Sequence, residues 1–158
     1  MRLAARLLAA AFVLTAALGA TARAQAPGDP YPSGVIRVYK AVDTRTRITF
    51  GDLWMSDGIA RFDELRGRME IRYVETLPPS ANPDLSGARI YQVLNSTQYF
   101  NFNRRKAGFC TLAVRWVGMR DLGNMQLRVT LMVMDDYHAS DQEKLALCAA
   151  ATYRLPAQ

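Results

Sequence analysis

The sequence predicts a mainly β protein: a small antiparallel β-barrel or sandwich with one or two short helices and one disulfide. Three observations predict this fold class. Apolar and polar residues alternate in several short segments, as they do in half-buried strands. Gly, Pro, Asn and Asp residues, which favour turns, separate these segments. The only two cysteines, Cys110 and Cys148, are expected to pair. An α+β arrangement is the alternative.

The amino terminus has the features of a secretory signal peptide. Arg2 and Arg6 precede an uncharged apolar stretch, Leu7 to Leu18, which is too short to span a bilayer. The sequence Ala22-Arg23-Ala24 has the small-x-small pattern of a cleavage site, so residues 1–24 are expected to be removed. We therefore expect a periplasmic or secreted protein, exported from a bacterium, with no transmembrane segment in the mature chain.

Removal of the signal peptide changes the charge of the chain. The full sequence has 20 basic and 14 acidic residues and a net charge of +6, and three of the arginines lie in residues 1–24. The mature chain would keep 17 basic and 14 acidic residues, a net charge of +3. A dedicated nucleic-acid-binding domain is usually much more basic. We therefore expect no nucleic-acid partner.

The mature chain is predicted to begin with an irregular segment. Residues 25–34 contain three prolines and two glycines and are expected to form a flexible leader, followed by a single β-rich domain over residues 35–158. Val35 to Val42 is rich in β-forming residues and predicts the first strand. Next, Ser56-Asp57 could cap a short helix over Ile59, Phe62 and Leu65, which recur at every third position and end before Gly67.

The remaining segments alternate with a period of two residues. This period predicts strands in which one face is apolar and the other polar. In one of them Cys110, Leu112, Val114 and Trp116 are expected to share the apolar face. In another, the final residues Leu131 to Met134 are apolar on both faces, which indicates a covered strand. The predicted strands are Arg68–Leu77, Ala88–Leu94, Phe109–Met119, Met125–Met134 and Ala149–Leu155. For the last of these a helix over its alanine-rich start is the alternative, since alanine favours helices.

The cysteine pair is expected to be structural. An exported protein reaches an oxidising compartment, and two cysteines allow only one intramolecular disulfide. The Cys110–Cys148 bridge would close a loop worth about 4 kcal/mol at most in the chain-entropy model. A redox or metal-binding role has less support, because the chain has no Cys-x-x-Cys motif and one histidine. The basic run Arg104-Arg105-Lys106 is expected to be a solvated turn before this disulfide.

Asp135 to Asp141 is the densest cluster of chemically active groups in the sequence. Asp135, Asp136, His138 and Asp141 are weak candidates for metal ligands, because carboxylates and imidazole bind divalent ions. Their spacing matches no metal-binding motif. Helix capping explains the segment more simply, since Ser140 and Glu143 form a capping box for a short helix that runs toward Cys148. No catalytic residue, cofactor or metal is therefore assigned.

A resemblance extends over roughly the last 70 residues. The order of Asn103, Phe109-Cys110, Arg115-Trp116, an apolar strand, an acidic loop and Cys148-Ala149 resembles small exported bacterial proteins of uncharacterised function. The resemblance implies a compact exported domain and supplies no active site. The expected architecture is also similar to that of periplasmic lysozyme inhibitors, which are small disulfide-linked β-barrels. Their inhibitory loop motif is not found in this sequence.

Three classes of function remain open from the sequence. The first is a protein-binding module of the cell envelope, such as an inhibitor or immunity-type protein. Its contacts would lie on loops, with Tyr99, Phe100, Arg104 and Arg105 as candidates because Tyr and Arg are favoured at binding hot spots. The second is a small-ligand or lipid carrier, since barrels can enclose a cavity. The third is an enzyme, although no nucleophile or phosphate-binding motif is present. We predict the first. Oligomeric state does not follow from the sequence.

Overall fold

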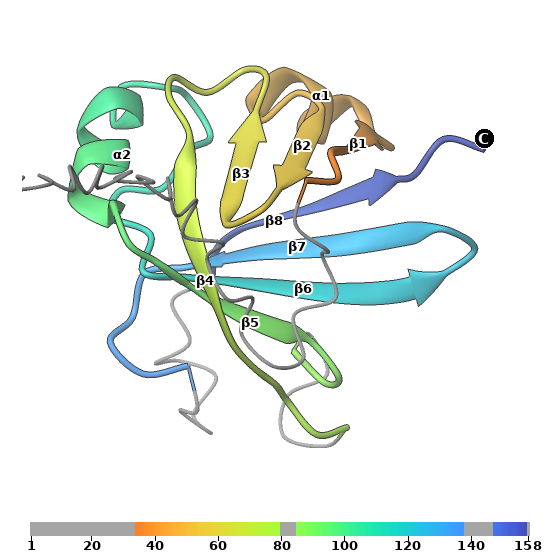
Figure 1. Ribbon diagram of the computed structural model, residues 1–158. Helices are drawn as coiled ribbons and strands as arrows, with labels where there is room; N and C mark the ends of the chain where they lie inside the picture. Colours follow the sequence, from red (N-terminus) through yellow and green to blue (C-terminus); the bar gives the residue numbers. More distant parts are fainter. Residues whose placement is uncertain (1–33, 80–84, 138–146, 158) are drawn as a thin grey trace, which may run out of the picture.

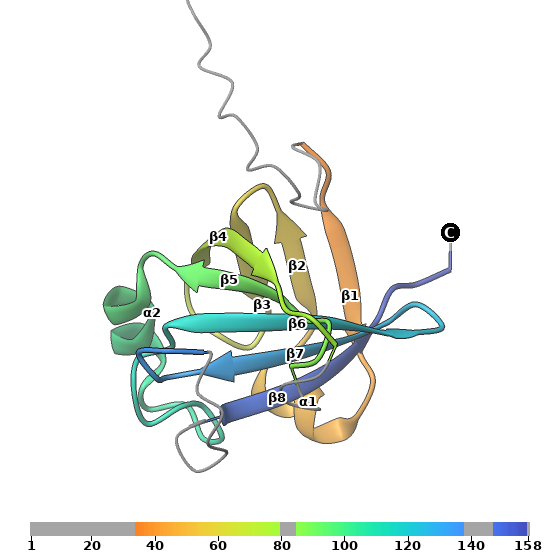
Figure 2. The same ribbon diagram turned by 90° about the horizontal axis from the view of Figure 1, so that it is seen from below.

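The computed structural model describes residues 34–79, 85–137 and 147–157. These residues form a closed barrel of eight antiparallel strands, in which each strand pairs with its neighbours in sequence and β8 returns to β1 (Figures 1 and 2). The predicted mainly β fold with one disulfide, Cys110–Cys148, is confirmed. The strands are β1 (Arg37–Ala41), β2 (Leu53–Ser56), β3 (Ile59–Phe62), β4 (Met69–Thr76), β5 (Arg89–Val93), β6 (Trp116–Gly123), β7 (Gln126–Met132) and β8 (Leu147–Arg154).

The alternating segments form strands as predicted. In β4, Met69 and Ile71 are buried while Glu70 and Arg72 are exposed. The same alternation places one face of β1, β5, β7 and β8 in the interior. The connection between β6 and β7 is a two-residue turn, Asn124-Met125, in which both residues have positive φ. This is the backbone twist that joins antiparallel strands most readily.

The helix predicted between Ser56 and Gly67 is wrong. Ile59 to Phe62 is β3, which pairs with β2 across a tight turn at Asp57-Gly58. Ala60 and Phe62 face the interior and Ile59 is half-buried, so the period of this segment is two and not three. The pattern was misleading because Leu65, the third member of the apparent helical stripe, lies beyond the strand and packs into the core from a loop.

The strand predicted over Phe109–Met119 begins only at Trp116. Cys110 and Val114 are buried, but Leu112 is 60% exposed and the segment that contains them is irregular. Trp116 also lies on a different face from the one predicted, because its ring packs on Tyr137 outside the barrel.

Cys148 lies within β8, whereas a helix was predicted to run up to it. The proposed helix start, Ser140 with Glu143, lies outside the described residues. The same holds for the signal peptide and for the leader, apart from Gly34 at its end.

Two short helices occupy connections between strands. α1 (Thr44–Thr49) follows β1, and the carboxylate of Asp43 caps it by accepting hydrogen bonds of 2.8 Å from the backbone N–H and the hydroxyl of Thr46. α2 (Ser96–Asn103) follows β5. The described residues thus contain two short helices, as the predicted fold class allows, but neither lies where the sequence predicted a helix.

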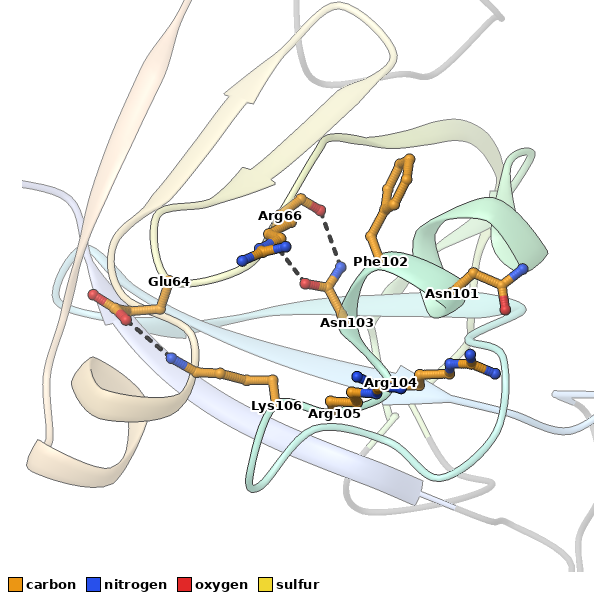
Figure 3. A pocket seen from close by; sticks show the side chains of 8 residues that line it. All are labelled: Glu64, Arg66, Asn101, Phe102, Asn103, Arg104, Arg105 and Lys106. Carbon is orange, nitrogen blue, oxygen red and sulfur yellow. Dashed lines mark hydrogen bonds and ion pairs between the residues drawn. The ribbon is translucent and has the colours of Figure 1, made fainter.

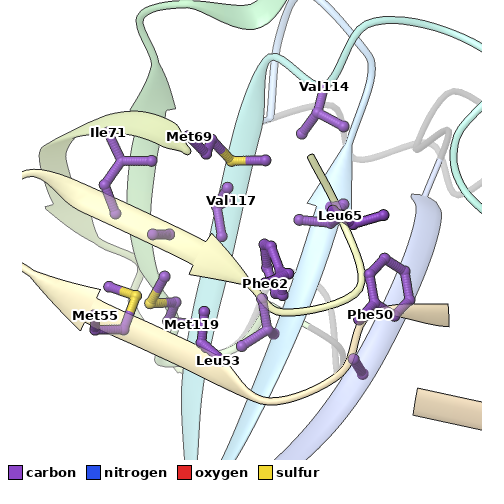
Figure 4. Packing of buried hydrophobic residues seen from close by; sticks show 14 of the residues in the cluster. Phe50, Leu53, Met55, Phe62, Leu65, Met69, Ile71, Val114, Val117 and Met119 are labelled. Atoms are coloured by element: carbon purple, nitrogen blue, oxygen red, sulfur yellow. The ribbon is translucent and has the colours of Figure 1, made fainter. Parts of the chain in front are cut away.

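Side chains occupy the interior of the barrel. Figure 4 shows Met55, Phe62, Met69, Val117 and Met119, contributed by strands from both sides of the barrel, within one buried cluster. The largest buried side chains include tyrosines, Tyr91, Tyr99 and Tyr153, each no more than 2% exposed. An eight-stranded barrel is just wide enough for side chains to fill it, as these do.

A second apolar cluster lies on the outer wall of β5, β6 and β7. Tyr137 packs its ring on Trp116, donates a hydrogen bond to Glu75, and lies with Met132, which is fully buried. The prediction that the end of β7 is covered on both faces is therefore confirmed. The cluster contains Leu85, Ala88, Ile90, Met132 and Tyr137, with Leu77, Trp116, Met134 and Leu147 packed at its edge.

The two ends of the barrel differ in their connections. In an antiparallel barrel of sequential strands, alternate connections lie at the same end. α1, the β3–β4 connection and α2 therefore share one end, which we call the helical end (Figure 1). Hydrogen bonds join these connections: the backbone N–H of Glu64 donates to the carbonyl of Phe50 after α1, and the side chain of Asn103 on α2 bonds to Arg66.

Candidate functional site

The helical end carries a groove between α2 and the β3–β4 connection (Figure 3). Its volume is about 490 Å³. Eight residues line it and are called the basic groove below: Glu64, Arg66, Asn101, Phe102, Asn103, Arg104, Arg105 and Lys106.

Asn103 fixes the geometry of the groove from beneath. Its side chain is 2% exposed and makes three hydrogen bonds. The amide oxygen accepts from the backbone N–H of Arg66 at 2.7 Å, and the amide nitrogen donates to the carbonyls of Arg66 at 3.0 Å and Tyr99 at 2.9 Å. The two walls of the groove, α2 and the β3–β4 connection, are thus held at a fixed spacing (Figure 3).

The charge of the groove is unbalanced. Its only carboxylate, Glu64, already accepts a hydrogen bond from Lys106 at 3.0 Å. The side chains of Arg66, Arg104 and Arg105 make no ion pair with any residue in the described part of the chain. Four cations thus face one carboxylate, and three guanidinium groups remain available to an anionic ligand. Guanidinium groups bind carboxylates with two parallel hydrogen bonds.

An aromatic side chain, Phe102, lies at the edge of the basic groove. Phe102 is 53% exposed although it is a large apolar side chain. Gly67 lies directly against it: a methyl group added at Gly67 would come within 3.2 Å of the Phe102 ring. Gly67 also has a φ of +77°, a conformation that favours glycine. Glycine at this position therefore allows the β3–β4 connection to pass close to the ring.

The four residues predicted as partner contacts divide between the surface and the interior. Arg104 and Arg105 line the groove, in agreement with their predicted exposure. Tyr99 is only 1% exposed and packs edge-to-face on Phe109, so its side chain is not available to a partner. Phe100 is half-buried against the core. The reason is the helix, which turns Tyr99 and Asn103 inward on one face and exposes Asn101 and Phe102.

Arg66, Phe102 and Lys106 belong to the groove but were not singled out as contacts from the sequence. Arg66 lies in the segment predicted as a helix, and Lys106 was treated as part of a solvated turn. Either phenylalanine of the run Phe100-Asn101-Phe102 could have been chosen as a contact. If this segment had been assigned to a helix, Phe102 would have been placed on the exposed face and Phe100 on another.

A second groove adjoins the first at Glu64 and has a volume of about 350 Å³. Lys40 and Asp52 form an ion pair of 2.6 Å in its wall. Burial of Asp52 raises the pKa of its carboxyl, but hydrogen bonds from Lys40 and from the backbone N–H of Ala41 outweigh burial, so the pKa lies below its usual value. Asp63 and Glu64 contribute further negative charge here, and Arg47 contributes a second cation.

The predicted metal candidates are only partly described. The carboxylate of Asp135 lies 3.2 Å from the Nε of Arg115, and His138 and Asp141 lie outside the described residues. Within residues 34–79, 85–137 and 147–157, no cluster of three or more His, Cys, Asp or Glu side chains could hold a metal ion.

No family model, curated protein or solved structure matches the chain significantly. Among the described residues, no helix has both the length and the apolar composition needed to cross a bilayer.

Proposed function

We propose that the protein is a binding module of the cell envelope and that its basic groove holds a segment of a protein partner. The observation that carries this proposal is the combination of Arg66, Arg104 and Arg105, unpaired within the described chain, with the exposed Phe102 on a spacing fixed by Asn103. Arginine and aromatic side chains are the groups most often found at the centres of protein interfaces. A groove that is already rigid loses little entropy when it binds.

The filled barrel favours this function over that of a carrier. Side chains such as Tyr91, Tyr153 and Phe62 occupy the interior, where a carrier of this fold would hold its ligand. The groove chemistry also favours binding over catalysis. Guanidinium and ammonium groups stabilise anions but do not accept protons at neutral pH, and the one carboxylate of the groove, Glu64, is held by Lys106.

Site-specific photocrosslinking in exporting cells tests the proposal. A benzoylphenylalanine placed at Asn101, in the groove, is expected to form an adduct with one discrete protein. The matched control carries the same group at Leu122, which is 40% exposed at the opposite end of the barrel (Figure 1). Equal adducts from both positions, or none from Asn101, would contradict a partner site in the groove.

A further inference from the structure

The charges of the groove also specify the chemistry of its occupant. We infer that the basic groove selects a short acidic protein segment, in which carboxylates lie on both sides of an apolar side chain. This inference rests on the proposed function and extends it from protein binding in general to one class of sequence.

The carboxylates of such a segment would complete the ion pairs that the groove lacks. Within the described chain, Arg66, Arg104 and Arg105 have no carboxylate partner, and the Lys106–Glu64 pair uses the only carboxylate that lines the groove. Arg104 and Arg105 follow α2 directly, while Arg66 lines the groove from the β3–β4 connection and extends toward Glu64 (Figure 3). Cations thus flank the groove on two walls, and anions on a bound segment would have partners on both.

Phe102 supplies the contact for the apolar side chain. Its ring is half-exposed at the edge of the groove and lies close to Gly67 of the β3–β4 connection. An aliphatic side chain covering this ring would remove apolar surface from water, at about 25 cal/mol for each Å² covered. Charge would then set the register of the segment, and the apolar contact would add affinity.

The surroundings of the groove favour a short segment over a long polyanion. The adjoining groove sets three carboxylates, Asp52, Asp63 and the shared Glu64, against Lys40 and Arg47, so it has no excess of positive charge. A nucleic acid or an anionic membrane extends its negative charge past any single site, and in the adjoining groove it would meet no second excess of cations. A peptide can place its acidic residues over the arginines alone. The positive charge is therefore local, as an acidic segment requires.

Peptide binding measured by fluorescence anisotropy tests this inference. The first probe is a labelled peptide with three glutamates around one leucine, and the second replaces the glutamates with glutamines. We expect the glutamate peptide to bind at least about tenfold more tightly. Its affinity should fall as salt rises from about 50 mM to about 300 mM, because salt screens exposed charges. Equal affinities for the two peptides would overturn the inference.

Charge-matched variants locate the binding. Arg105→Gln is expected to weaken the glutamate peptide about fivefold to tenfold. Arg154→Gln removes the same charge from the exposed end of β8, on the far side of the barrel from α2 (Figures 1 and 2), and should leave the affinity unchanged. Equal losses in the two variants would show that net charge, and not the groove, attracts the peptide, which would overturn the assignment.

The outcomes separate this inference from the function on which it rests. A discrete protein adduct at Asn101 together with equal binding of the two peptides would leave the binding module in place and overturn the acidic segment. Binding of phosphatidylglycerol vesicles that requires Arg105, with no protein adduct, would overturn both proposals in favour of a membrane surface.

Discussion

The side-chain amide of Asn103 makes hydrogen bonds to three backbone groups that would otherwise bind water. Two of these groups belong to Arg66 and one to Tyr99, so a single side chain connects the β3–β4 connection to α2. Buried backbone groups that lose their partners incur a desolvation cost of about 1–3 kcal/mol. The geometry of the groove therefore depends on one residue.

Asn103→Ala is expected to lower the free energy of unfolding by about 1–3 kcal/mol, because it leaves the N–H and carbonyl of Arg66 without partners. Urea unfolding followed by tryptophan fluorescence measures the change. Asn101→Ala is the matched control, since Asn101 lies on the exposed face of the same helix. A variant at Asn103 no less stable than the control would show that water replaces these hydrogen bonds.

Asp43 provides a test at low pH. The hydrogen bond from the backbone N–H of Thr46, followed by that from its hydroxyl, lowers the pKa of Asp43 below its usual 3.8. A carboxyl with a lowered pKa in the folded state stabilises the protein above its unfolded pKa, and this contribution is lost as the pH falls through the folded value. Asp43→Asn keeps a capping group without the charge.

Wild type is therefore expected to be more stable than Asp43→Asn at neutral pH, by less than about 1 kcal/mol, and this difference should vanish as the pH falls below 3.8. Urea unfolding of both proteins across this pH range measures it. A difference that stays constant with pH would mean that the charge of Asp43 does not contribute.

At the scale of elements, the packing of α2 against the β3–β4 connection sets the position of Phe102. Gly67→Ala should lower stability by about 1–2 kcal/mol, because its φ is +77°. It should also weaken binding of the glutamate peptide, since the new methyl group would push against the Phe102 ring. Gly87→Ala is the control: its φ is +70° but nothing lies within 4 Å. Urea unfolding measures the backbone strain in both variants, and peptide anisotropy measures the effect of moving the Phe102 ring. Equal peptide affinities of the two variants would show that the ring is not displaced.

The sequence predicted the strands in which alternation continues over many residues, as in Met69, Ile71 and their exposed neighbours. It missed β2 and assigned β3 to a helix, because each of these strands has only four residues. It did not predict α1, because Thr44–Thr49 is polar and β-branched and is held as a helix chiefly by the cap at Asp43. It did not predict α2 either, whose inward residues Tyr99 and Asn103 include a polar one. The cap of α1 is a local hydrogen bond over three residues, but the β-branched residues after it favour a strand. α2 is tied to Arg66 by hydrogen bonds across 37 residues, and a local pattern carries no record of these.

The same limit applies to the groove. Arg104 and Arg105 could be found because two adjacent cations are visible in the sequence. Arg66 could not be found in this way. It comes near Arg104 and Arg105 only in the folded barrel, where Asn103 connects the β3–β4 connection to α2. Proximity across 37 residues is a property of the closed fold.

At the scale of the molecule, the Cys110–Cys148 disulfide attaches the segment after α2 to β8. Arg104, Arg105 and Lys106 lie between α2 and this attachment. Replacing both cysteines with alanine is expected to lower the free energy of unfolding by up to about 4 kcal/mol. The reason is that the bridge closes a loop between two residues 38 positions apart, which restricts the unfolded chain. The replacement should also weaken peptide binding, because the basic run loses one of its two anchors.

Thermal unfolding with and without reductant measures this effect. Reductant should lower the melting temperature of the wild type and leave the double variant unchanged. A double variant as stable as the wild type would show that packing of the segment around Phe109, rather than the disulfide, holds it in place.

The barrel closes through two short joints. β1 meets β8 in two residue pairs, Lys40↔Arg154 and Ala41↔Tyr153, and β3 meets β4 in two, Ile59↔Glu70 and Ala60↔Met69. β1, β2 and β3 can therefore separate together while β4 to β8 stay paired, at a lower free energy than global unfolding. Amide protons of β2 and β3 should exchange with deuterium sooner than those of β6 and β7. The connection that leaves β3 forms one wall of the basic groove, so a bound segment should slow exchange in β3 first, and deuterium uptake there would report occupancy of the groove.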